Sequence, residues 1–185
     1  MVNRIPKSIR PLVLLAAVLL SLAAAGCAPT ARVSVNPGFT VPQDIDTVYV
    51  VPFVDTLVPP DVSSAVFDQF VDMLNDGRSA TPVQQFVIIK QDLATVDPAW
   101  LAKQLYVTGE VWGYLENSGC CSTEMRMKAR AYLHDRGAKA PAAEITVPLE
   151  TFFDHDRATT KTVRQRLARQ AAKELSAGIL DALHR

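Results

Sequence analysis

Three stretches in the second half of the chain alternate apolar and polar residues with a period of two. They cover residues 106–116, 122–135 and 143–153. In the second stretch, for example, Met125 and Met127 fall on one side, whereas charged residues occupy the other. This alternation is typical of antiparallel strands that bury one face and leave the other in water. We therefore predict three such strands.

The first of these stretches is rich in aromatic residues. Strict alternation places a small and apolar set on its inner side: Val107, Gly109, Val111, Gly113 and Leu115. The same rule places Tyr106, Trp112 and Tyr114 together on the outer side. Aromatic side chains are enriched in the cores of protein interfaces, so Trp112 and Tyr114 are candidate interface residues. The alternative is that helices cover this side and bury both rings.

The first half of the chain shows a different pattern. Residues 47–54 are apolar on both faces, as expected of a central strand, and Pro52 indicates a bulge or a strand end there. Apolar residues at helical spacing predict a helix over residues 61–74. Residues 84–90 form a second β-rich run, and a short helix is predicted over residues 99–105, with a proline in its first turn.

A long amphipathic helix is predicted over residues 157–183, which completes the order β-α-β-α-β-β-β-α. We expect a single domain over residues 46–185, built as an α/β (α+β) sandwich. Its sheet would be mixed but largely antiparallel, with about five strands, and the helices would pack on it.

The first 26 residues do not fit this domain. Arg4, Lys7 and Arg10 form a basic start, and residues 12–20 form a short apolar run that small residues follow. This order is typical of a secretory signal peptide over residues 1–26. A membrane-spanning helix needs about 20 apolar residues, which is more than this run provides. The alternative is an uncleaved N-terminal anchor helix.

A single cysteine follows the leader. The sequence AAGC, which ends at Cys27, resembles the bacterial lipobox, in which the cysteine thiol is acylated and the chain is cut just before it. The resemblance implies that a triacylated Cys27 anchors the chain, since stable anchoring takes more than one acyl chain. Ala28 stands where lipoproteins of enteric type that stay at the inner membrane carry aspartate. For a bacterium of that type with two membranes, the resemblance implies the outer membrane, and the inner membrane is the alternative. Residues 27–45 would form the lipidated cysteine and a tether with a reach of about 25 Å.

Without the predicted leader the chain holds sixteen basic and nineteen acidic residues, a formal charge of −3. This balance gives no sign of a nucleic-acid partner. The charge is unevenly distributed, because residues 44–97 hold nine acidic and two basic side chains, whereas residues 98–185 hold ten acidic and thirteen basic ones. Two differently solvated faces would explain this division. Contact between the acidic and basic parts of neighbouring copies would explain it as well.

The last predicted helix carries a run of basic residues without acidic ones: Arg157, Lys161, Arg164, Arg166, Arg169 and Lys173. A solvated helix face would account for this run. A contact with an anionic partner would also do so, either lipid headgroups or the acidic part of a neighbouring copy. In that case Arg164, Arg169 and Lys173 are the candidate contact residues.

Cys120 and Cys121 lie in a predicted turn, NSGCCS, between two strands. In an oxidising compartment they could form a strained vicinal disulfide or a disulfide with another chain, or they could remain a pair of thiols. Two cysteine ligands without a neighbouring histidine do not match a zinc pattern. We therefore predict no metal site and no cofactor.

Histidine and acidic residues also occur together at predicted strand ends, in His134-Asp135 and Asp154-His155-Asp156. Polar residues are expected at such ends in any case. The sequence contains no nucleophile elbow, phosphate-binding loop, zinc-protease motif or dinucleotide-binding fingerprint. We therefore expect no catalytic residues and no enzyme activity.

Several short motifs resemble a group of bacterial envelope proteins. VYVVPFVD, QQFVIIK, WLAKQL and YVTGEVWGY follow one another along the chain as they do in that group. The group includes the curli secretion lipoprotein, the Pel polysaccharide export lipoprotein, the lipoprotein activator of penicillin-binding proteins and the N-terminal domain of the Tol propeller protein. The matching positions here are Pro52, Phe53, Gly109 and Glu110. The resemblance covers residues 46–116 and implies a periplasmic, non-catalytic assembly or accessory domain.

Together these features predict a membrane-anchored periplasmic lipoprotein. It would bind other envelope proteins or its own copies, and it would support export or cell-wall assembly without chemistry of its own. The alternative is a periplasmic carrier or sensor whose sheet binds a small or lipidic ligand, a role that requires an apolar pocket. An enzyme is the third interpretation.

Overall fold

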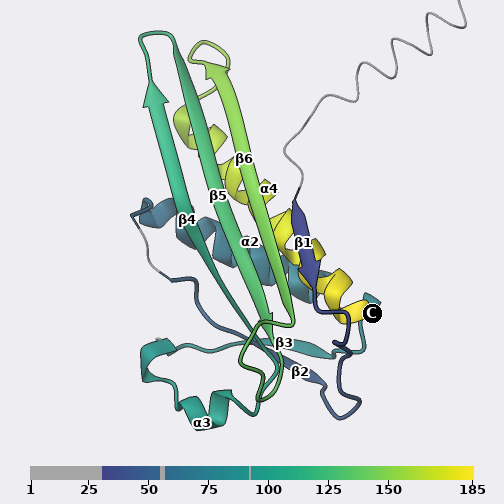
Figure 1. Cartoon of the computed structure of the whole chain (residues 1–185). Helices are drawn as coiled ribbons and strands as arrows, with labels where there is room; N and C mark the ends of the chain where they lie inside the picture. Colours follow the sequence, from purple (N-terminus) through teal and green to yellow (C-terminus); the bar gives the residue numbers. More distant parts are fainter. Residues whose placement is uncertain (1–30, 55–56, 92) are drawn as a thin grey trace, which may run out of the picture. The chain divides into compact units, whose positions relative to one another are not determined.

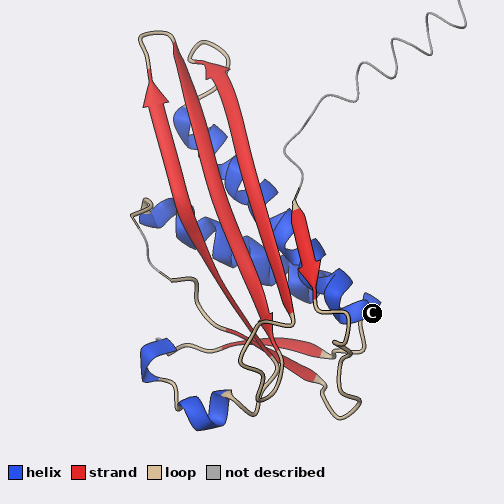
Figure 2. Cartoon of the chain, in the orientation of Figure 1, coloured by secondary structure: helices blue, strands red, loops and turns tan. Residues whose placement is uncertain are grey.

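The computed structural model describes residues 31–54, 57–91 and 93–185. In these residues six strands form one sheet in the order β1-β6-β5-β4-β2-β3 (Figures 1 and 2). The strands are β1 Arg32–Val35, β2 Thr47–Val50, β3 Gln85–Ile88, β4 Tyr106–Ser118, β5 Ser122–His134 and β6 Ala143–Asp154. The helices are α2 Pro60–Gly77, α3 Pro98–Leu101 and α4 Thr160–His184, with 3-10 turns at Arg78–Ala80 and Leu93–Thr95.

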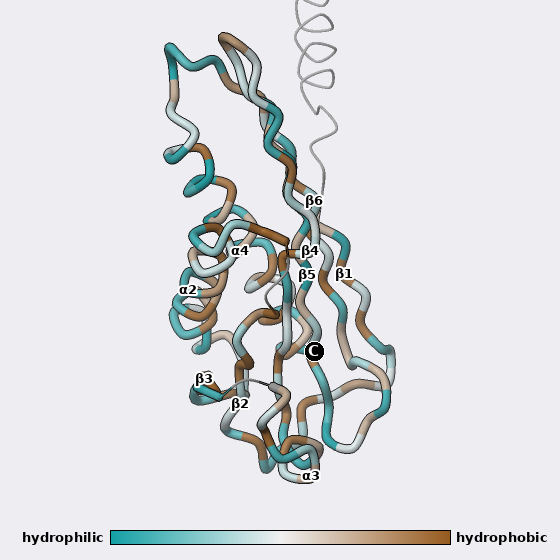
Figure 3. Tube along the Cα trace, turned by 90° about the vertical axis from the view of Figure 1, so that its left-hand side faces the viewer, coloured by the Kyte–Doolittle hydropathy of each residue, from teal (hydrophilic) through white to brown (hydrophobic). Residues whose placement is uncertain are grey.

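The sheet is mixed. β2 runs parallel to β3 and β4, whereas β4 with β5, β5 with β6 and β6 with β1 pair antiparallel. The helices α2 and α4 pack against each other on one side of the sheet (Figure 3). From β2 onward the order of elements is the predicted β-α-β-α-β-β-β-α, and the predicted mixed α/β fold is confirmed.

The sixth strand, β1, lies in the stretch that the sequence analysis assigned to a tether over residues 27–45. Arg32 lies beside Thr146, so β1 extends the sheet beyond β6. Phe39 and Ile45 belong to the core, and each is only 7% exposed. The described part of this stretch is therefore part of the domain. The sequence analysis missed β1 because a run of four residues is too short to establish a period.

Helix α4 covers the sheet as its pattern predicted. The side chain of Thr159 caps the helix by accepting a hydrogen bond from the backbone N–H of Thr162 (3.2 Å). The buried face contains the predicted inward residues: Val163, Leu167, Ala171, Leu175, Ile179 and Leu183. Gly178 permits a close approach to the sheet, because a Cβ atom at this position would lie 2.6 Å from Cγ1 of Ile145.

A second close approach joins the end of β2 to β4. Phe53 follows β2, and its ring lies so near Gly109 that a Cβ atom there would be 2.4 Å from Cε1 of the ring. Phe67 and Phe70 of α2 contact the same ring, each with a centroid separation of 5.4 Å. This packing gives a physical reason for two of the positions at which the chain resembles the envelope-protein group.

Candidate interaction surface

A β-bulge at Trp112 divides β4 into two parts. The register with β5 is regular as far as Val111, and from Gly113, which pairs with Lys128, it is shifted by one residue. A shift of one residue moves every following side chain to the opposite face of the sheet. The prediction that Trp112 and Tyr114 share one face is therefore wrong.

Tyr114 lies on the side of the sheet that the helices cover. It pairs with Met127, which is fully buried, and its hydroxyl donates a hydrogen bond to Glu116 (2.9 Å). Burial, followed by the hydrogen bond with Glu116, raises the pKa of Tyr114 to about 12. The alternative interpretation, in which the helices cover the ring, is thus the one that holds for Tyr114.

Arg164 of α4 completes this cluster. Its Nε and Nη2 atoms donate to Glu116 at 3.0 and 2.8 Å. Nε also donates to the Tyr114 hydroxyl at 3.1 Å, and Nη1 donates to Asp61 of α2 at 3.4 Å. The hydrogen bond with Glu116 raises the pKa of Arg164 above its ordinary value. Because its guanidinium bonds to groups on three elements, Arg164 links β4, α4 and α2, and its part in a contact with another chain stays a prediction.

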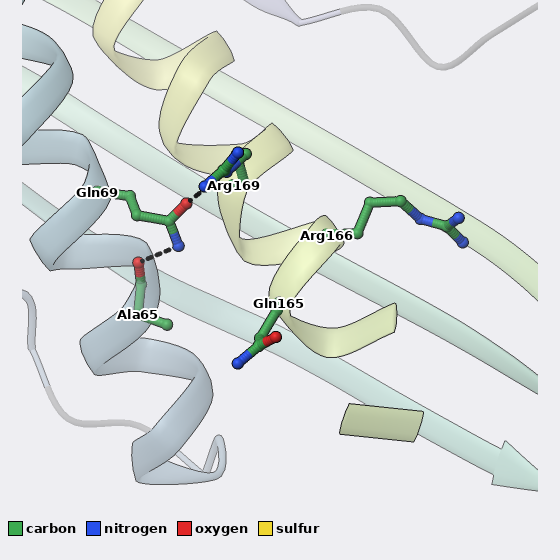
Figure 4. Close-up of a pocket in the computed structure, with 5 residues that line it drawn as sticks. All are labelled: Ala65, Gln69, Gln165, Arg166 and Arg169. Atoms are coloured by element: carbon green, nitrogen blue, oxygen red, sulfur yellow. Dashed lines mark hydrogen bonds between the residues drawn. The ribbon is translucent and has the colours of Figure 1, made fainter. Parts of the chain in front are cut away.

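Arg169 lines a groove between α2 and α4. Its Nε atom donates to Oε1 of Gln69 (3.2 Å), and Gln69 in turn donates to the carbonyl of Ala65 (3.0 Å). The groove has a volume of about 490 Å³, and its lining also includes Gln165 and Arg166 (Figure 4). Arg166 points away from the other four side chains (Figure 4), so the two guanidinium groups do not converge on one anion.

Lys173, the third basic candidate, is exposed further along α4. On α2 the side chains of Asp68, Asp72 and Asp76 are exposed as well. The acidic and basic parts of the sequence meet within one copy at the ion pair of Arg164 with Asp61 (3.4 Å), which joins α4 to α2.

The opposite side of the sheet has a different character. We use the term open face for the side of β4, β5 and β6 that α2 and α4 do not cover. Three large apolar side chains on it, Trp112, Leu115 and Phe152, are 43%, 48% and 67% exposed. Lys128 Nζ lies 5.0 Å and the Arg130 guanidinium 5.6 Å from the centre of the Trp112 ring. The predicted exposure of Trp112 is thus confirmed.

Ion pairs surround these apolar groups. Arg126 of β5 contacts Glu124 at 2.5 Å and Glu150 at 3.5 Å, and Arg130 pairs with Glu110. The open face is therefore nearly neutral, with aromatic and aliphatic side chains set among paired charges. This combination is typical of protein interfaces, whose cores are depleted of unpaired charge and enriched in aromatic residues.

The open face also contains a hollow of about 250 Å³, which the sequence analysis did not foresee. Tyr106, Tyr132 and His134 line it, together with Thr108 and Glu110. The ring of Tyr106 stacks on His134 with a centroid separation of 4.5 Å, and Nε2 of His134 is 2.9 Å from the Thr108 hydroxyl. Burial lowers the pKa of His134. Alternate positions on two paired strands carry these residues, so only knowledge of the register could have brought them together.

The cysteine pair lies at the other end of β4 and β5. Cys120 and Cys121 are exposed, and their Sγ atoms are 3.2 Å apart in a hydrogen bond, which raises the pKa of Cys121. Nearby, Nε2 of His155 is 2.7 Å from the Thr123 hydroxyl. His155 and His134 thus lie at opposite ends of β5. Within the described ranges no group of three or more residues of the metal-binding types comes together, and a disulfide at this pair stays a prediction.

The predicted lipidation site, Cys27, lies outside the described residues, as does the predicted signal peptide. In the part of the chain that the structure describes, no helix has the length and the apolar content needed to span a bilayer.

No protein-family model matches the sequence, and no curated protein matches it. Among solved structures, a PelC dodecamer from Paraburkholderia phytofirmans matches with a TM-score of 0.53 and 17% identity, over 80% of this chain and 97% of that one. A single-substitution variant of that PelC, also a dodecamer, matches with a TM-score of 0.55 and 16% identity, over 84% and 99%. Rare lipoprotein B from Shewanella oneidensis matches with a TM-score of 0.43 and 9% identity, over 72% and 94%.

At such low identity the likeness to PelC shows a shared fold. The mixed α/β architecture that the sequence predicts is thus one that solved structures also adopt.

Proposed function

We propose that the chain is a lipid-anchored accessory protein on the periplasmic face of the outer membrane. It binds other envelope proteins or its own copies, and it supports an export or cell-wall complex without chemistry of its own. The observation that carries this proposal is the open face, on which Trp112, Leu115 and Phe152 are exposed together among paired charges. Soluble proteins rarely expose several large apolar side chains on one face unless that face binds something.

The comparisons support the same proposal. The PelC proteins that share this fold are dodecamers, which makes self-association of this chain a reasonable expectation. Lipidation of Cys27 would hold the domain at the membrane, where such complexes assemble.

A carrier for a small or lipidic ligand has less support. Ligand pockets usually have volumes of about 300–1,000 Å³ and are mainly apolar. The aromatic hollow on the open face is smaller, at about 250 Å³. The larger groove between α2 and α4 is lined by glutamine and arginine side chains, which suit neither a lipid nor an apolar ligand.

Photo-crosslinking in cells tests the proposed function. A photoreactive amino acid replaces Trp112 or Leu115 on the open face of the full-length protein. The matched control carries it at Gln170, which is exposed on α4. We expect adducts with envelope proteins or with further copies from the two open-face positions and few from the control. Equal adducts from all three positions, or none from the open face, would refute the assignment of this face.

A further inference from the structure

Two strands of the sheet have edges without a partner in the described part of the chain. β2 pairs with the first residues of β4, and a last bridge joins Val54 to Glu110. β1 pairs with β6 only as far as Thr146. Residues 113–118 of β4 and 147–154 of β6 are thus open edges. Such edges present unpaired backbone groups and are ready templates for another strand.

Backbone alternation identifies the groups that point outward from β6. The carbonyls of Leu105, Val107 and Gly109 accept hydrogen bonds from the β2 segment, so odd-numbered residues of β4 face β2 before the bulge. The backbone groups of even-numbered β5 residues therefore face β4, and those of odd-numbered β5 residues face odd-numbered residues of β6. The backbone groups of the even-numbered residues of β6 are left pointing away from β5. Pro148 is one of them, in agreement with the rule that a strand proline, which lacks an N–H, occupies an outer edge.

Glu150 and Phe152 therefore present both their N–H and C=O groups at the open edge of β6. On β4 the bulge at Trp112 reverses the alternation. Beyond it the backbone groups of Leu115 face β5, where Leu115 pairs with Arg126, and those of Tyr114 and Glu116 face outward.

The directions of the two strands determine how they can meet. β4 and β6 are both antiparallel to β5, so they run the same way. A second copy placed beside the first by rotation about an axis along the strands keeps this direction, and its β4 then lies parallel to β6 of the first copy. In parallel pairing, an outward-facing residue bonds to the two residues that flank its neighbour on the other strand.

From this geometry we propose that β4 of one copy adds to β6 of another, with Phe152 beside Leu115 of the neighbouring copy. The N–H of Phe152 donates to the carbonyl of Tyr114, and the carbonyl of Phe152 accepts from the N–H of Glu116. In this register both the backbone groups and the side chains match, because Phe152 and Leu115 lie on the open face. The inference deepens the proposed function and rests on it for the role of this face.

The side chains give an independent reason for this register. Within one copy Leu115 and Phe152 lie on either side of β5, and because Leu115 is level with Glu150, two residues before Phe152, they are about 12 Å apart. Across the proposed contact they are one strand spacing apart, about 4.8 Å, so two of the most exposed apolar side chains on the open face cover each other. Apolar cross-strand pairs of this kind stabilise sheets.

The charges beside the two edges are complementary. Near the open edge of β4, the two carboxylates of Asp61 and Glu116 share the single guanidinium of Arg164, which leaves a net negative charge there. α4 packs on β5 and β6, and Arg166 extends from it on the side away from α2 (Figure 4). Opposite charges on the two flanks favour head-to-tail contact over contact between like edges. Because each copy has one edge of each kind, addition continues until the copies close into a ring or form a filament.

Engineered disulfides test the register. Leu115→Cys and Phe152→Cys are combined in the full-length protein, with Cys120→Ser and Cys121→Ser to remove the native thiol pair, and the protein is oxidised in detergent. We expect a ladder of covalent oligomers. A mixture of the two single-cysteine proteins should give heterodimers and no longer species. In the matched control Thr108→Cys replaces Leu115→Cys, because Thr108 lies on the same strand and face but where β2 covers the edge. No ladder, or the same ladder from the control, would overturn the proposal.

Backbone substitution separates strand pairing from side-chain contact. Phe152→Pro removes an N–H that points away from β5 and has no partner among the described residues, and Phe152→Ala removes the ring but keeps that N–H. In sedimentation we measure the protein concentration at which half of the chains are associated. We expect this concentration to be at least about tenfold higher for Phe152→Pro than for Phe152→Ala, and we expect both variants to melt like the wild type. Equal effects of the two variants would refute strand addition. Adducts with other envelope proteins that persist in a strictly monomeric chain would overturn this inference and leave the proposed function standing.

Discussion

The contact of Phe53 with Gly109 gives the sharpest prediction about stability. In Gly109→Ala the added Cβ atom would lie 2.4 Å from Cε1 and 2.7 Å from Cζ of the Phe53 ring. Phe67 and Phe70 hold that ring in place, so it cannot move aside without disturbing α2. Overpacking in a well-packed core costs about 1–3 kcal/mol, and we expect the upper end, about 3 kcal/mol.

The expected loss is large enough to measure by heat. For a domain of this size, 1 kcal/mol corresponds to a change of about 2–4 °C in melting temperature, so Gly109→Ala should melt about 6–12 °C below the wild type. In the double variant with Phe53→Leu, the smaller side chain relieves the clash. The two substitutions should therefore show a favourable coupling of about 1–2 kcal/mol, within the usual range for residues in contact.

Gly113 supplies a matched control on the same strand. A Cβ atom there would meet only the side chain of Lys128, at 3.5–3.7 Å, which is an ordinary contact. Gly113→Ala should leave the melting temperature unchanged or raise it slightly, because alanine loses less backbone entropy than glycine on folding. A Gly109→Ala protein as stable as Gly113→Ala, or additive effects in the double variant, would show that the ring does not depend on the glycine.

Three further predictions concern the anchor, the core and pH. Cys27→Ser should leave the precursor uncut and without lipid, as mass spectrometry of the membrane fraction would reveal; a protein of wild-type mass that still enters detergent would count against the lipobox. Leu167→Asp should unfold the domain, because Leu167 is 2% exposed and an unpaired buried charge costs several kcal/mol, comparable to the whole stability of about 5–15 kcal/mol; an unchanged melting curve would mean that α4 does not need this contact. Burial lowers the pKa of His134, so the folded state favours the neutral ring. The contribution of His134 to the stability of the fold is therefore complete above the ordinary histidine pKa of 6.5 and is lost as the pH falls below that value. Chemical denaturation of the wild type and of His134→Phe at about pH 8 and about pH 5, on either side of the ordinary histidine pKa, should show that the variant loses less free energy of unfolding between the two pH values. Equal losses would exclude His134 as the source of the pH dependence.

The sequence was most informative where one pattern ran for many residues. Helix α4 extends over 25 residues, so its inward face, including Leu167 and Leu175, could be assigned by helical spacing alone. The three long strands were predictable for the same reason. Their alternation also placed the exposed residues of β5 correctly, since that strand has no irregularity with β6.

The candidate interface was harder to predict, because one inserted residue changes everything after it. Strict alternation placed Leu115 inside and Tyr114 outside, and the bulge at Trp112 reverses both positions. Gly113 was a usable signal, since glycine within a strand often marks a bulge. The role of Arg164 could not be foreseen either. Its partners Glu116 and Asp61 are distant in sequence, and only the folded register brings them to one guanidinium.

Strand β1 has a consequence for the anchoring of the domain. Because the described domain begins at Ala31, only residues 28–30 separate it from Cys27, and four residue steps span at most about 14 Å when fully extended. A lipidated Cys27 would therefore hold the domain by a tether shorter than the reach of about 25 Å expected for a coil over the whole predicted tether. Copies anchored in this way would lie at the same distance from the membrane and diffuse in its plane. Their encounters are then governed by the number of molecules per unit area of membrane, and a contact too weak to form in free solution can become populated there, because anchoring raises the effective concentration of partner edges.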